Sequence, residues 1–470
     1  MLTALGRLFF LPFWRLLVHL DFHLEVPMKR CSALLLIWCW VCGFEAERVF
    51  AQQPPAGKNS VVSEYVNEHL PNWLNIGGEL RTRLEGFSGG GFRHDNDDLY
   101  LLTRFRLNLG IKPTSWLKFQ FQGQDAQVFG KNTNPDGPPF EDTFDLRMAY
   151  VELGDSEKKP IGLRVGRQEL VFGEQRLIGH VSWLNTARSF DAVRATFRHK
   201  GYRLNAFASS VVNVREGEFN KRSDGNNFHG LYGGIEKLVP QAVIEPYLLW
   251  RLAPRLRTEL GSVSNLDHKT TGFRWAGKLP ASFDYSVEMA NQRGSLGTDQ
   301  VRAWAGHWLL GRTMGRLAYK PRFILEYNYA SGDKNPRDGV IGTFDQLYPT
   351  PHDKTGLADQ IGWRNIHHLR SGVELKPAAK WLLSTSYHSF WLADRHDGLY
   401  GVNSALIVRV ADGSAGRFVG QELDVQAVWN ASKTTQIAGG YAYLFPGTFL
   451  KSTTPGSAYG FPFVSVNYLF

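Results

Sequence analysis

Short alternating segments fill the chain from about residue 73 to its end, and the connections between them alternate between tight and long. We count eighteen such segments, each with the two-residue period of a β-strand. Tight connections include Lys112–Thr114 and Lys200–Gly201. We expect long connections at Lys131–Glu141, Val171–Arg188, Val214–Asn227, Pro254–Thr270, Gly332–Arg364 and Ala393–Arg417. An even strand count with short turns at one end and long loops at the other is typical of transmembrane β-barrels.

Each segment carries one apolar and one polar face. In Leu99–Ile111, Phe105 and Leu107 face one way and Arg104 and Arg106 the other. The next segment sets Phe119 and Phe121 against Gln120 and Gln122. In a soluble sandwich the apolar face would point at a core, whereas in a wide barrel it points at lipid and the polar face lines water.

The chain has 470 residues, without a linker or composition break in its main part. Beyond the N-terminal region no stretch holds 18 consecutive apolar residues, which excludes a helical membrane protein. We therefore predict an all-β fold, a single transmembrane antiparallel β-barrel of about eighteen strands over residues 73–470. Its short turns would be periplasmic and its long loops external, which places the protein in the outer membrane.

The N-terminal region reads as an export signal. Met28 and two basic residues precede the apolar run Cys31–Phe44, and small and polar residues follow up to Ala51. This order predicts a signal peptide in residues 1–51, cleaved after Ala51, followed by a periplasmic segment over residues 52–72. Met28 is then a candidate for the true first residue. The alternative is a membrane anchor built from Leu8–Leu20 and the later run.

The positions of the cysteines and the net charge limit which ligands the mature chain can bind. All three cysteines lie within the predicted signal, so the mature chain offers neither disulfides nor cysteine ligands. Removing the five Lys/Arg and four Asp/Glu of residues 1–51 lowers the formal charge from +9 to +8. For an exported chain this favours an anionic ligand over nucleic acid, although a generic basic surface would give the same number.

The inward faces of the predicted strands carry many arginines. Rings of arginine favour anions in a pore, and a guanidinium binds carboxylates through two parallel hydrogen bonds. Two other interpretations stay open: these side chains pair with inward glutamates such as Glu79 and Glu326, or they lie at the rims and bind lipid head groups. The candidate solute-binding residues are Arg81, Arg83, Arg104, Arg106, Arg147, Arg194 and Arg322.

Two motifs carry a resemblance to a known family. One runs from Val165–Leu170 through Gly173 and Gly179 to Trp183–Ala192, and the other from Ala330–Asp333 onwards. Both resemble the alginate export family of outer-membrane porins. The resemblance implies a monomeric eighteen-stranded barrel through which an anionic polyuronate leaves the periplasm.

The resemblance also places particular residues. It assigns Arg167, Arg176 and Arg188 to an inward gating loop, and Asp333, Asp338 and Asp345 to the long outer loop. Because Val171–Arg188 also contains Trp183, we expect this loop to fold into the mouth. The aspartates of the outer loop suit side-chain-to-backbone turns, and a calcium site is the alternative. We expect no metal and no cofactor.

The last segment alternates Val464, Val466 and Tyr468 on one face and ends at Phe470. A final strand that closes on an aromatic C-terminus resembles the signal read by the barrel assembly machinery. The partners expected from the sequence are therefore this machinery, outer-membrane lipid and an anionic polysaccharide. Periplasmic secretion proteins are further candidates.

Two rival functions remain. An outer-membrane hydrolase would need a site at the rim, yet none of its candidate histidines stands in a nucleophile motif: His180, His307, His352, His367, His368, His388 and His396. A specific uptake porin for small organic acids or sugars would share the barrel and its basic lumen. We therefore expect a channel rather than an enzyme.

Overall fold

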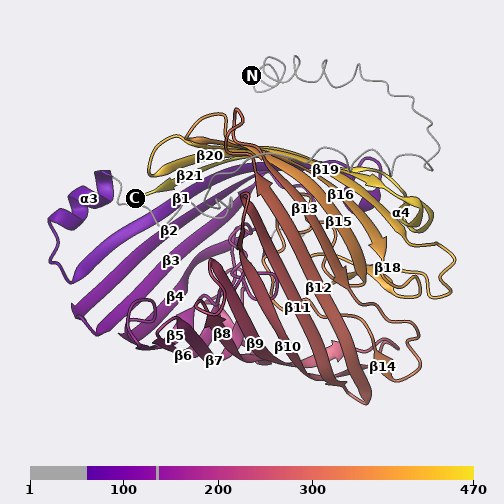
Figure 1. The fold of residues 1–470 in the computed structure, drawn as a ribbon, viewed down its shortest axis with the longest axis horizontal. Helices are drawn as coiled ribbons and strands as arrows, with labels where there is room; N and C mark the ends of the chain where they lie inside the picture. The colour runs from indigo at the N-terminus through magenta and orange to yellow at the C-terminus, as the bar shows by residue number, and fades with distance from the viewer. Residues whose placement is uncertain (1–60, 134–136) are drawn as a thin grey trace. The chain divides into compact units, whose positions relative to one another are not determined.

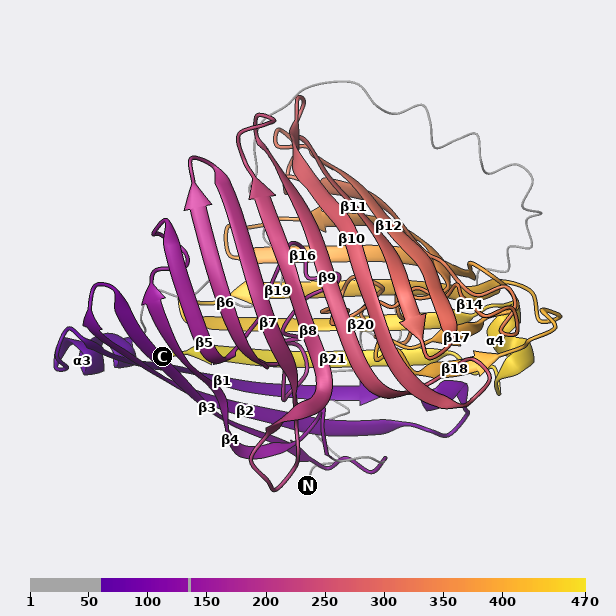
Figure 2. The same ribbon diagram turned by 90° about the horizontal axis from the view of Figure 1, so that it is seen from below.

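The computed structural model describes residues 61–133 and 137–470, so the predicted export signal lies outside the described residues. Eighteen long strands form the barrel wall (Figures 1 and 2): β1 (Leu74–Phe87), β2 (Asp98–Thr114), β3 (Leu117–Phe129), β4 (Asp142–Gly154), β5 (Ile161–Gln168), β6 (Phe190–His199), β7 (Tyr202–Asn213), β8 (Lys221–Ile235), β9 (Ala242–Arg257), β10 (Val263–Leu279), β11 (Phe283–Leu296), β12 (Asp299–Thr313), β13 (Arg322–Ala330), β15 (Ile366–Leu375), β16 (Trp381–Leu392), β19 (Phe418–Asn430), β20 (Thr435–Pro446) and β21 (Tyr459–Leu469). The remaining elements are α3 (Val61–Glu68), η2 (Gly90–Phe92), β14 (Val340–Ile341), β17 (Gly398–Tyr400), β18 (Leu406–Arg409) and α4 (Thr448–Thr453). In both views α3 lies at one end of the barrel, and β14, β17, β18 and α4 lie at the other.

Every wall strand pairs antiparallel with its two neighbours, and the last strand closes on the first. β21 pairs with β1, with Leu469 opposite Glu79 and Phe463 opposite Glu85. The backbone of Phe470 adds two hydrogen bonds to Gly78, of 2.7 and 3.0 Å. The short β14 joins β12 in parallel, and β17 pairs only with β18. The predicted closed antiparallel barrel of eighteen strands is thereby confirmed, and closure leaves its wall no exposed edge.

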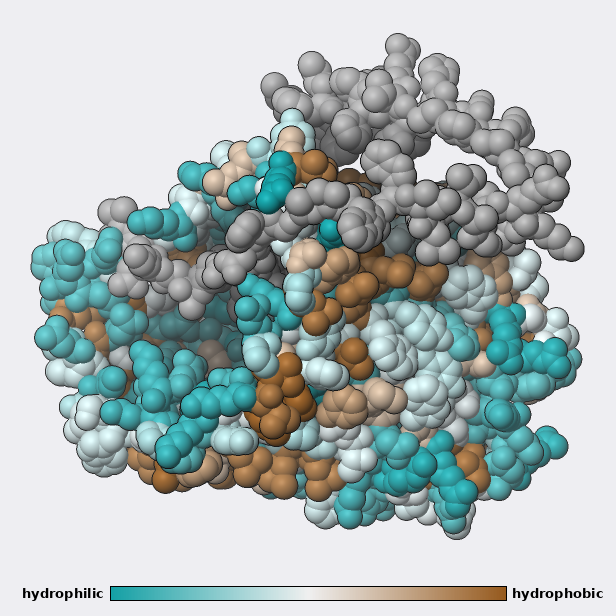
Figure 3. All heavy atoms as spheres, in the orientation of Figure 1, coloured by the Kyte–Doolittle hydropathy of each residue, from teal (hydrophilic) through white to brown (hydrophobic). Residues whose placement is uncertain are grey.

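The two faces of the wall follow the sequence pattern. Phe105 and Leu107 are 39% and 43% exposed, whereas Arg104 and Arg106, between and beside them, are 2% exposed. Because alternate residues of a strand point to opposite faces, the first pair faces outward and the second inward. Figure 3 shows hydrophilic side chains gathered at both ends of the barrel, with hydrophobic side chains between them. This apolar band is the surface that meets lipid.

The predicted lengths of two external connections are wrong. The connection predicted at Val214–Asn227 is shorter, because β8 already begins at Lys221. The one predicted at Pro254–Thr270 is a tight turn between β9, which continues to Arg257, and β10, which begins at Val263. These strand ends extend past the apolar band, where neither face meets lipid and the alternation of apolar and polar residues fades. The strands continue because backbone pairing, not side-chain pattern, holds them together there.

Two long connections fold into the barrel. We name residues 169–189 the first inserted loop and residues 331–365 the second inserted loop. Their backbones pair in a parallel bridge between Ile178 and Tyr348. Apolar side chains from both loops pack against inward-facing residues of the wall, such as Phe190 and Phe228, in one buried cluster. The expectation that Val171–Arg188 folds inward is correct, and the external half of the lumen contains a packed apolar core.

Among the described residues, no helix has the length and apolar character needed to cross a membrane.

The position of Leu107 near the middle of β2 gives a direct test of the outward face. Leu107→Arg should lower the free energy of unfolding by about 2–4 kcal/mol, because it places a cation in the middle of the apolar band. Denaturant titration in lipid vesicles measures this cost. Leu99→Arg, at the external end of the same face, is the matched control and should cost about 0–1 kcal/mol. Equal costs at both positions would show that this face does not cross the bilayer.

Candidate functional site: the inner wall and its inserted loops

Three arginines of the inner wall hold the backbone of the first inserted loop. Arg81 Nη1 donates to the carbonyl oxygen of Ser182 at 2.8 Å, and Arg83 Nη1 to that of Trp183 at 2.6 Å. Arg104 Nη1 donates to the carbonyls of Ser182 and Leu184, at 2.9 and 3.0 Å. The guanidinium of Arg83 also lies 3.9 Å from the centroid of the Trp183 ring. These cations therefore satisfy carbonyls that would otherwise be buried without partners.

Carboxylates on the same strands neutralise part of this cluster. Glu79 accepts a hydrogen bond from Arg104 Nε at 3.0 Å and forms an ion pair with Arg106 at 3.4 Å. Glu85 lies 2.6 Å from Arg83 Nε. Arg81 stands directly opposite Arg104 in the strand register, and its bonds to the first inserted loop all go to neutral oxygens. The cluster thus keeps a surplus of positive charge.

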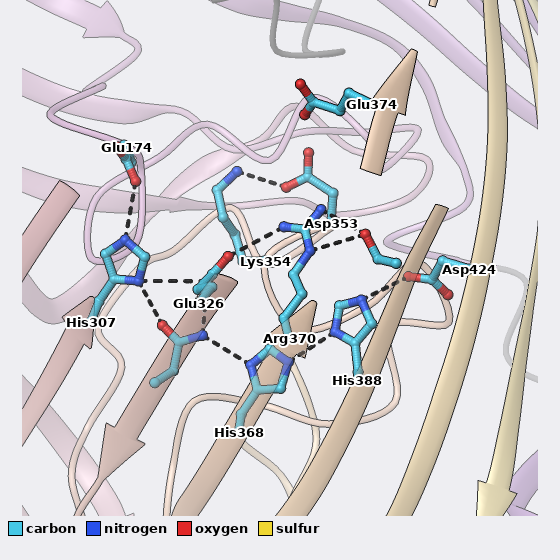
Figure 4. Close-up of polar contacts among 12 residues, drawn as sticks. Glu174, His307, Glu326, Asp353, Lys354, His368, Arg370, Glu374, His388 and Asp424 are labelled. Carbon is cyan, nitrogen blue, oxygen red and sulfur yellow. Dashed lines mark hydrogen bonds and ion pairs between the residues drawn. The ribbon is translucent and has the colours of Figure 1, made fainter. Parts of the chain in front are cut away.

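The opposite wall holds the first inserted loop through ion pairs. Arg176 of the loop bonds Glu326 of β13 at 2.7 Å. Glu326 also pairs with Arg370 of β15 at 3.3 Å (Figure 4). Glu174 of the loop bonds Arg274 of β10 at 2.8 Å. Inward glutamates therefore pair with arginines, as one of the alternative interpretations supposed, and the lumen contains a lattice of both signs.

A chain of histidines crosses the wall beside this lattice. His368 Nε2 lies 2.9 Å from His388 Nδ1, and His388 Nε2 lies 3.2 Å from Asp424 (Figure 4). His307 contacts Asn328, whose amide also reaches His368. Because both ring nitrogens of His388 are engaged within the protein, this histidine is not poised to take a proton from a substrate.

The second inserted loop is held by wall side chains that accept from its amides. Glu422 accepts from the amide of Ala358 at 2.9 Å, and Asp424 from that of Leu357 at 3.0 Å. The two loops also bind each other. Trp183 stacks on His352 with ring centroids 3.7 Å apart. Gly179 permits the close approach of the two backbones, since a Cβ at this position would lie 2.2 Å from Thr350 Oγ1.

The three predicted aspartates of the outer loop organise its turns. Asp333 accepts from the amides of Asn335 and Gly342, and Asp338 from that of Val340, each at 2.8 Å. These are the side-chain-to-backbone turns expected from the sequence. Within the described residues, no group of three or more His, Cys, Asp or Glu side chains is arranged to hold a metal ion.

Asp345 accepts from the amide of Leu347 at 3.1 Å, and it also ties the second inserted loop to the wall. It pairs with Arg251 of β9 and lies 3.0 Å from His268 Nε2 of β10. Burial alone would raise the pKa of this carboxyl group, but Arg251 and His268 outweigh burial and hold the pKa well below its usual range.

The other predicted residues divide between lumen, loop and outer face. Arg147 faces inward and pairs with Glu169, and Arg322 pairs with Asp284 and Glu374. Arg188 donates to two loop carbonyls, those of Gly179 and Pro349. Arg167 differs from the expectation, because it belongs to β5 rather than to the loop. Its guanidinium pairs with Asp191, and strand alternation places both on the outward face.

A basic stripe remains below the inserted loops, towards the end of the barrel with the short turns. Arg194 bonds the side-chain oxygen of Asn205 at 2.8 Å, and Arg198 the carbonyl of Ser156 at 3.0 Å, so both partners are neutral. Arg164 stands directly opposite Arg194 and pairs with Glu152 at 3.0 Å. Arg203 stands directly opposite Arg198 and pairs with Glu245 at 2.7 Å. Arg203, two residues after the turn Lys200–Gly201, was missed in the sequence, although its parity marks it as inward.

Cavities border the inserted loops and this stripe. One is lined by the anchoring arginines Arg81, Arg83 and Arg104 together with Trp183, and a second by Arg176, Arg322 and Arg370; both reach Gln426. A third, of about 370 Å³, opens at the short-turn end of the wall. Its charged lining residues are the cations Lys112, Lys118, Lys158 and Arg164 and the carboxylates Glu152, Asp155 and Glu157. A solute entering from this end therefore meets charges of both signs before it reaches the loops.

A closed wall of strands with an apolar band outside, charged side chains inside and loops folded into the lumen defines an outer-membrane channel. The sequence model described as "Alginate export" matches residues 72–461, so the chain belongs to the alginate export family. The comparison with curated proteins gave no match.

Solved outer-membrane porins share the fold. The structure of Acinetobacter baumannii OccAB2 superposes with a TM-score of 0.57 at 12% identity, covering 84% of this chain and 98% of that one. Pseudomonas aeruginosa OccK5 (OpdH) gives a TM-score of 0.56 at 12% identity, with the same coverage. Pseudomonas aeruginosa OpdK with vanillate gives 0.57 at 10% identity, again covering 84% and 98%. At these identities the likeness establishes the fold alone.

The first inserted loop should limit ion flow. Deleting Gln175–Asn185 should raise the single-channel conductance in planar bilayers, because these residues occupy the lumen between opposite walls. A deletion of Arg215–Phe219, in the exposed turn between β7 and β8, is the matched control and should leave conductance unchanged. Equal conductance of wild type and the first deletion would mean that the loop does not obstruct the pore.

Proposed function

We propose that this protein is an outer-membrane channel whose basic inner wall passes an anionic polysaccharide, such as alginate, out of the cell. The observation that carries the proposal is the stripe of Arg164, Arg194, Arg198 and Arg203. Arg164 and Arg203 pair with glutamates of the wall. Arg194 and Arg198 bond neutral oxygens, so the stripe keeps a surplus of positive charge that favours an anion. Guanidinium groups suit carboxylates because they offer two parallel hydrogen bonds.

The route for a polymer would run along this stripe to the inserted loops. In the structure the loops fill the lumen and leave small cavities beside Arg81 and Arg322. A polyuronate would therefore require the loops to shift, and its carboxylates would compete for the arginines that bind loop carbonyls. Family membership supports export of alginate, and the arrangement of charges supports an anion as the solute.

Uptake of small organic acids is the second candidate. The porin OpdK, whose fold this chain shares, was solved with vanillate, a small carboxylate. The small volume left beside the loops also suits a small acid better than a polymer. Export and uptake predict the same charge selectivity, so block by a polymer distinguishes the two.

Charge selectivity tests the basic stripe. The wild-type reversal potential under a salt gradient should favour anions, and the preference should weaken as salt rises, since the Debye length is about 10 Å at 0.1 M. Arg194→Glu combined with Arg198→Glu should shift the potential towards cations. Arg215→Glu combined with Arg222→Glu makes the same charge change at the external rim, where both side chains are exposed, and should have a smaller effect.

Added polyuronate oligomer identifies the solute. It should block chloride current through the wild type and block the Arg194/Arg198 variant less. A cation-selective wild type would refute a polyanion channel. An anion-selective wild type that ignores polyuronate but is blocked by small carboxylates would replace export of alginate with uptake of organic acids.

A further inference from the structure

Three cations stand in a row on the outward face of the wall. Lys269 of β10 is directly opposite Arg293 of β11, and Arg293 is directly opposite Arg302 of β12. All three side chains are exposed, and the residues that alternate with them, such as Thr270 and Gln292, are buried inside the barrel. We name Lys269, Arg293 and Arg302 the outer cation row.

The three side chains of the outer cation row contact only neutral groups in the hydrogen bonds and ring contact described next, so these contacts do not neutralise their charge. Arg293 Nη1 donates to its neighbour's carbonyl, that of Gln292, at 2.8 Å, and Arg302 Nη2 to the amide oxygen of Gln300 at 2.6 Å. Lys269 Nζ lies 5.4 Å from the centroid of the Trp250 ring. Each of these partners is neutral. Like charges directly opposite each other destabilise a sheet, so the row is unfavourable without an anion.

Another outward cation is neutralised within the protein, because Arg167 pairs with Asp191 at 2.8 Å. Asp267 lies two residues from Lys269 on the same face, but it accepts a hydrogen bond from the indole of Trp250 at 2.7 Å. The outer cation row is therefore a concentration of positive charge that the wall leaves for a ligand.

The level of the row places it among lipid head groups. Lys269 precedes the short-turn end of β10, at Leu279, by ten residues, which span roughly 25 Å along the barrel axis at about 3.3 Å per residue and a tilt of about 40°. Roughly 25 Å is the height of the apolar band of such barrels. Trp250, in the same row, and Trp304, two residues below Arg302, are exposed aromatics of the kind found at the bilayer interface. Phe273 and Met289 continue the face below them with apolar side chains.

The surface at the row is also hollowed. An open depression of about 420 Å³ is lined by Arg293, Arg302, Gln300, Val301 and Gly294. Two guanidinium groups at its sides suit phosphate, because each can offer a pair of parallel hydrogen bonds to phosphate oxygens. Lys269 extends the positive surface to a third strand.

We propose that the outer cation row binds the phosphate groups of a phosphorylated glycolipid of the outer leaflet. The anion between the strands would remove the repulsion among the three cations, and the acyl chains would lie along the apolar face below. The proposal rests on the outer-membrane location given under Proposed function, and it holds for a channel of any charge selectivity.

Native mass spectrometry of the full-length barrel in neutral detergent tests the site with diphosphoryl lipid A as the probe. The wild type should bind this lipid. In Arg293→Gln combined with Arg302→Gln the affinity should fall by a factor of about ten or more, because charge-assisted bonds to phosphate are lost. Arg215→Gln combined with Arg222→Gln, at the turn between β7 and β8 and separated from the outer cation row by β9, should bind as the wild type does. Equal binding by all three proteins would overturn the proposal.

Two further arms identify the ligand. A dephosphorylated form of the same lipid should bind wild type and variant alike; if it binds the wild type as tightly as the diphosphorylated form, phosphate is not recognised. Inorganic phosphate at millimolar concentration should not displace the lipid, and full displacement would make free phosphate the ligand instead. These experiments measure lipid binding and not current. A negative result would therefore overturn the lipid site without bearing on the proposed selectivity of the channel.

Thermal unfolding gives a second readout that a damaged fold would not imitate. In neutral detergent without lipid, the Arg293/Arg302 double variant should melt above the wild type, because the repulsion between opposite cations is gone. With diphosphoryl lipid A the order should reverse. A variant that melts below the wild type in both media would overturn the proposal.

Discussion

Hydrogen bonds between charged wall side chains and the backbone of the inserted loops hold the interior of this barrel together. A loop carried into the lumen brings carbonyl and amide groups that have no strand to pair with. Leaving such a group unpaired when buried costs about 1–3 kcal/mol. Arg81, Arg83 and Arg104 donate to carbonyls of the first inserted loop, and Glu422 and Asp424 accept from amides of the second. The two signs of wall charge thus serve the two kinds of backbone group.

This arrangement gives the arginines two roles that compete. An arginine that holds a loop carbonyl is not free to bind a solute, yet a carboxylate is a stronger acceptor than a carbonyl because it is charged. A polyanion reaching Arg81 or Arg104 could therefore replace the loop as their partner. A polyanion of the kind proposed above would then open its own route, because the groups that hold the loop in the lumen would become its binding partners.

The barrel itself could be predicted from the sequence, because lipid imposes a strict pattern. The alternation of Phe105 and Leu107 with Arg104 and Arg106 decides which face of β2 meets the bilayer. The predicted strand ends are wrong where the chain extends beyond the lipid and the alternation of apolar and polar residues is lost. Lys221 and Arg257 lie in strand ends beyond the apolar band, where sequence suggested loops.

The partners of the inward arginines could not be predicted. The parity of Arg81 and Arg83 shows that they face the lumen, but their acceptors are backbone carbonyls, which every residue carries and no sequence pattern marks. The loop that supplies these carbonyls is about a hundred residues away, so only the folded chain brings them together. The position of Arg167 was missed for the opposite reason: the motif suggested a loop residue, whereas parity within β5 gives the outward face and the pairing with Asp191.

We infer that Arg81, Arg83 and Arg104 obstruct the lumen by holding the first inserted loop in place. The most direct measurement is the single-channel conductance and reversal potential of a variant with all three changed to glutamine, which keeps their approximate size and removes their charge. We expect a larger conductance, because the loop loses its donors, together with a retained preference for anions from Arg194 and Arg198. An unchanged conductance with loss of anion preference would contradict it, since the three arginines would then act on the solute and not on the loop.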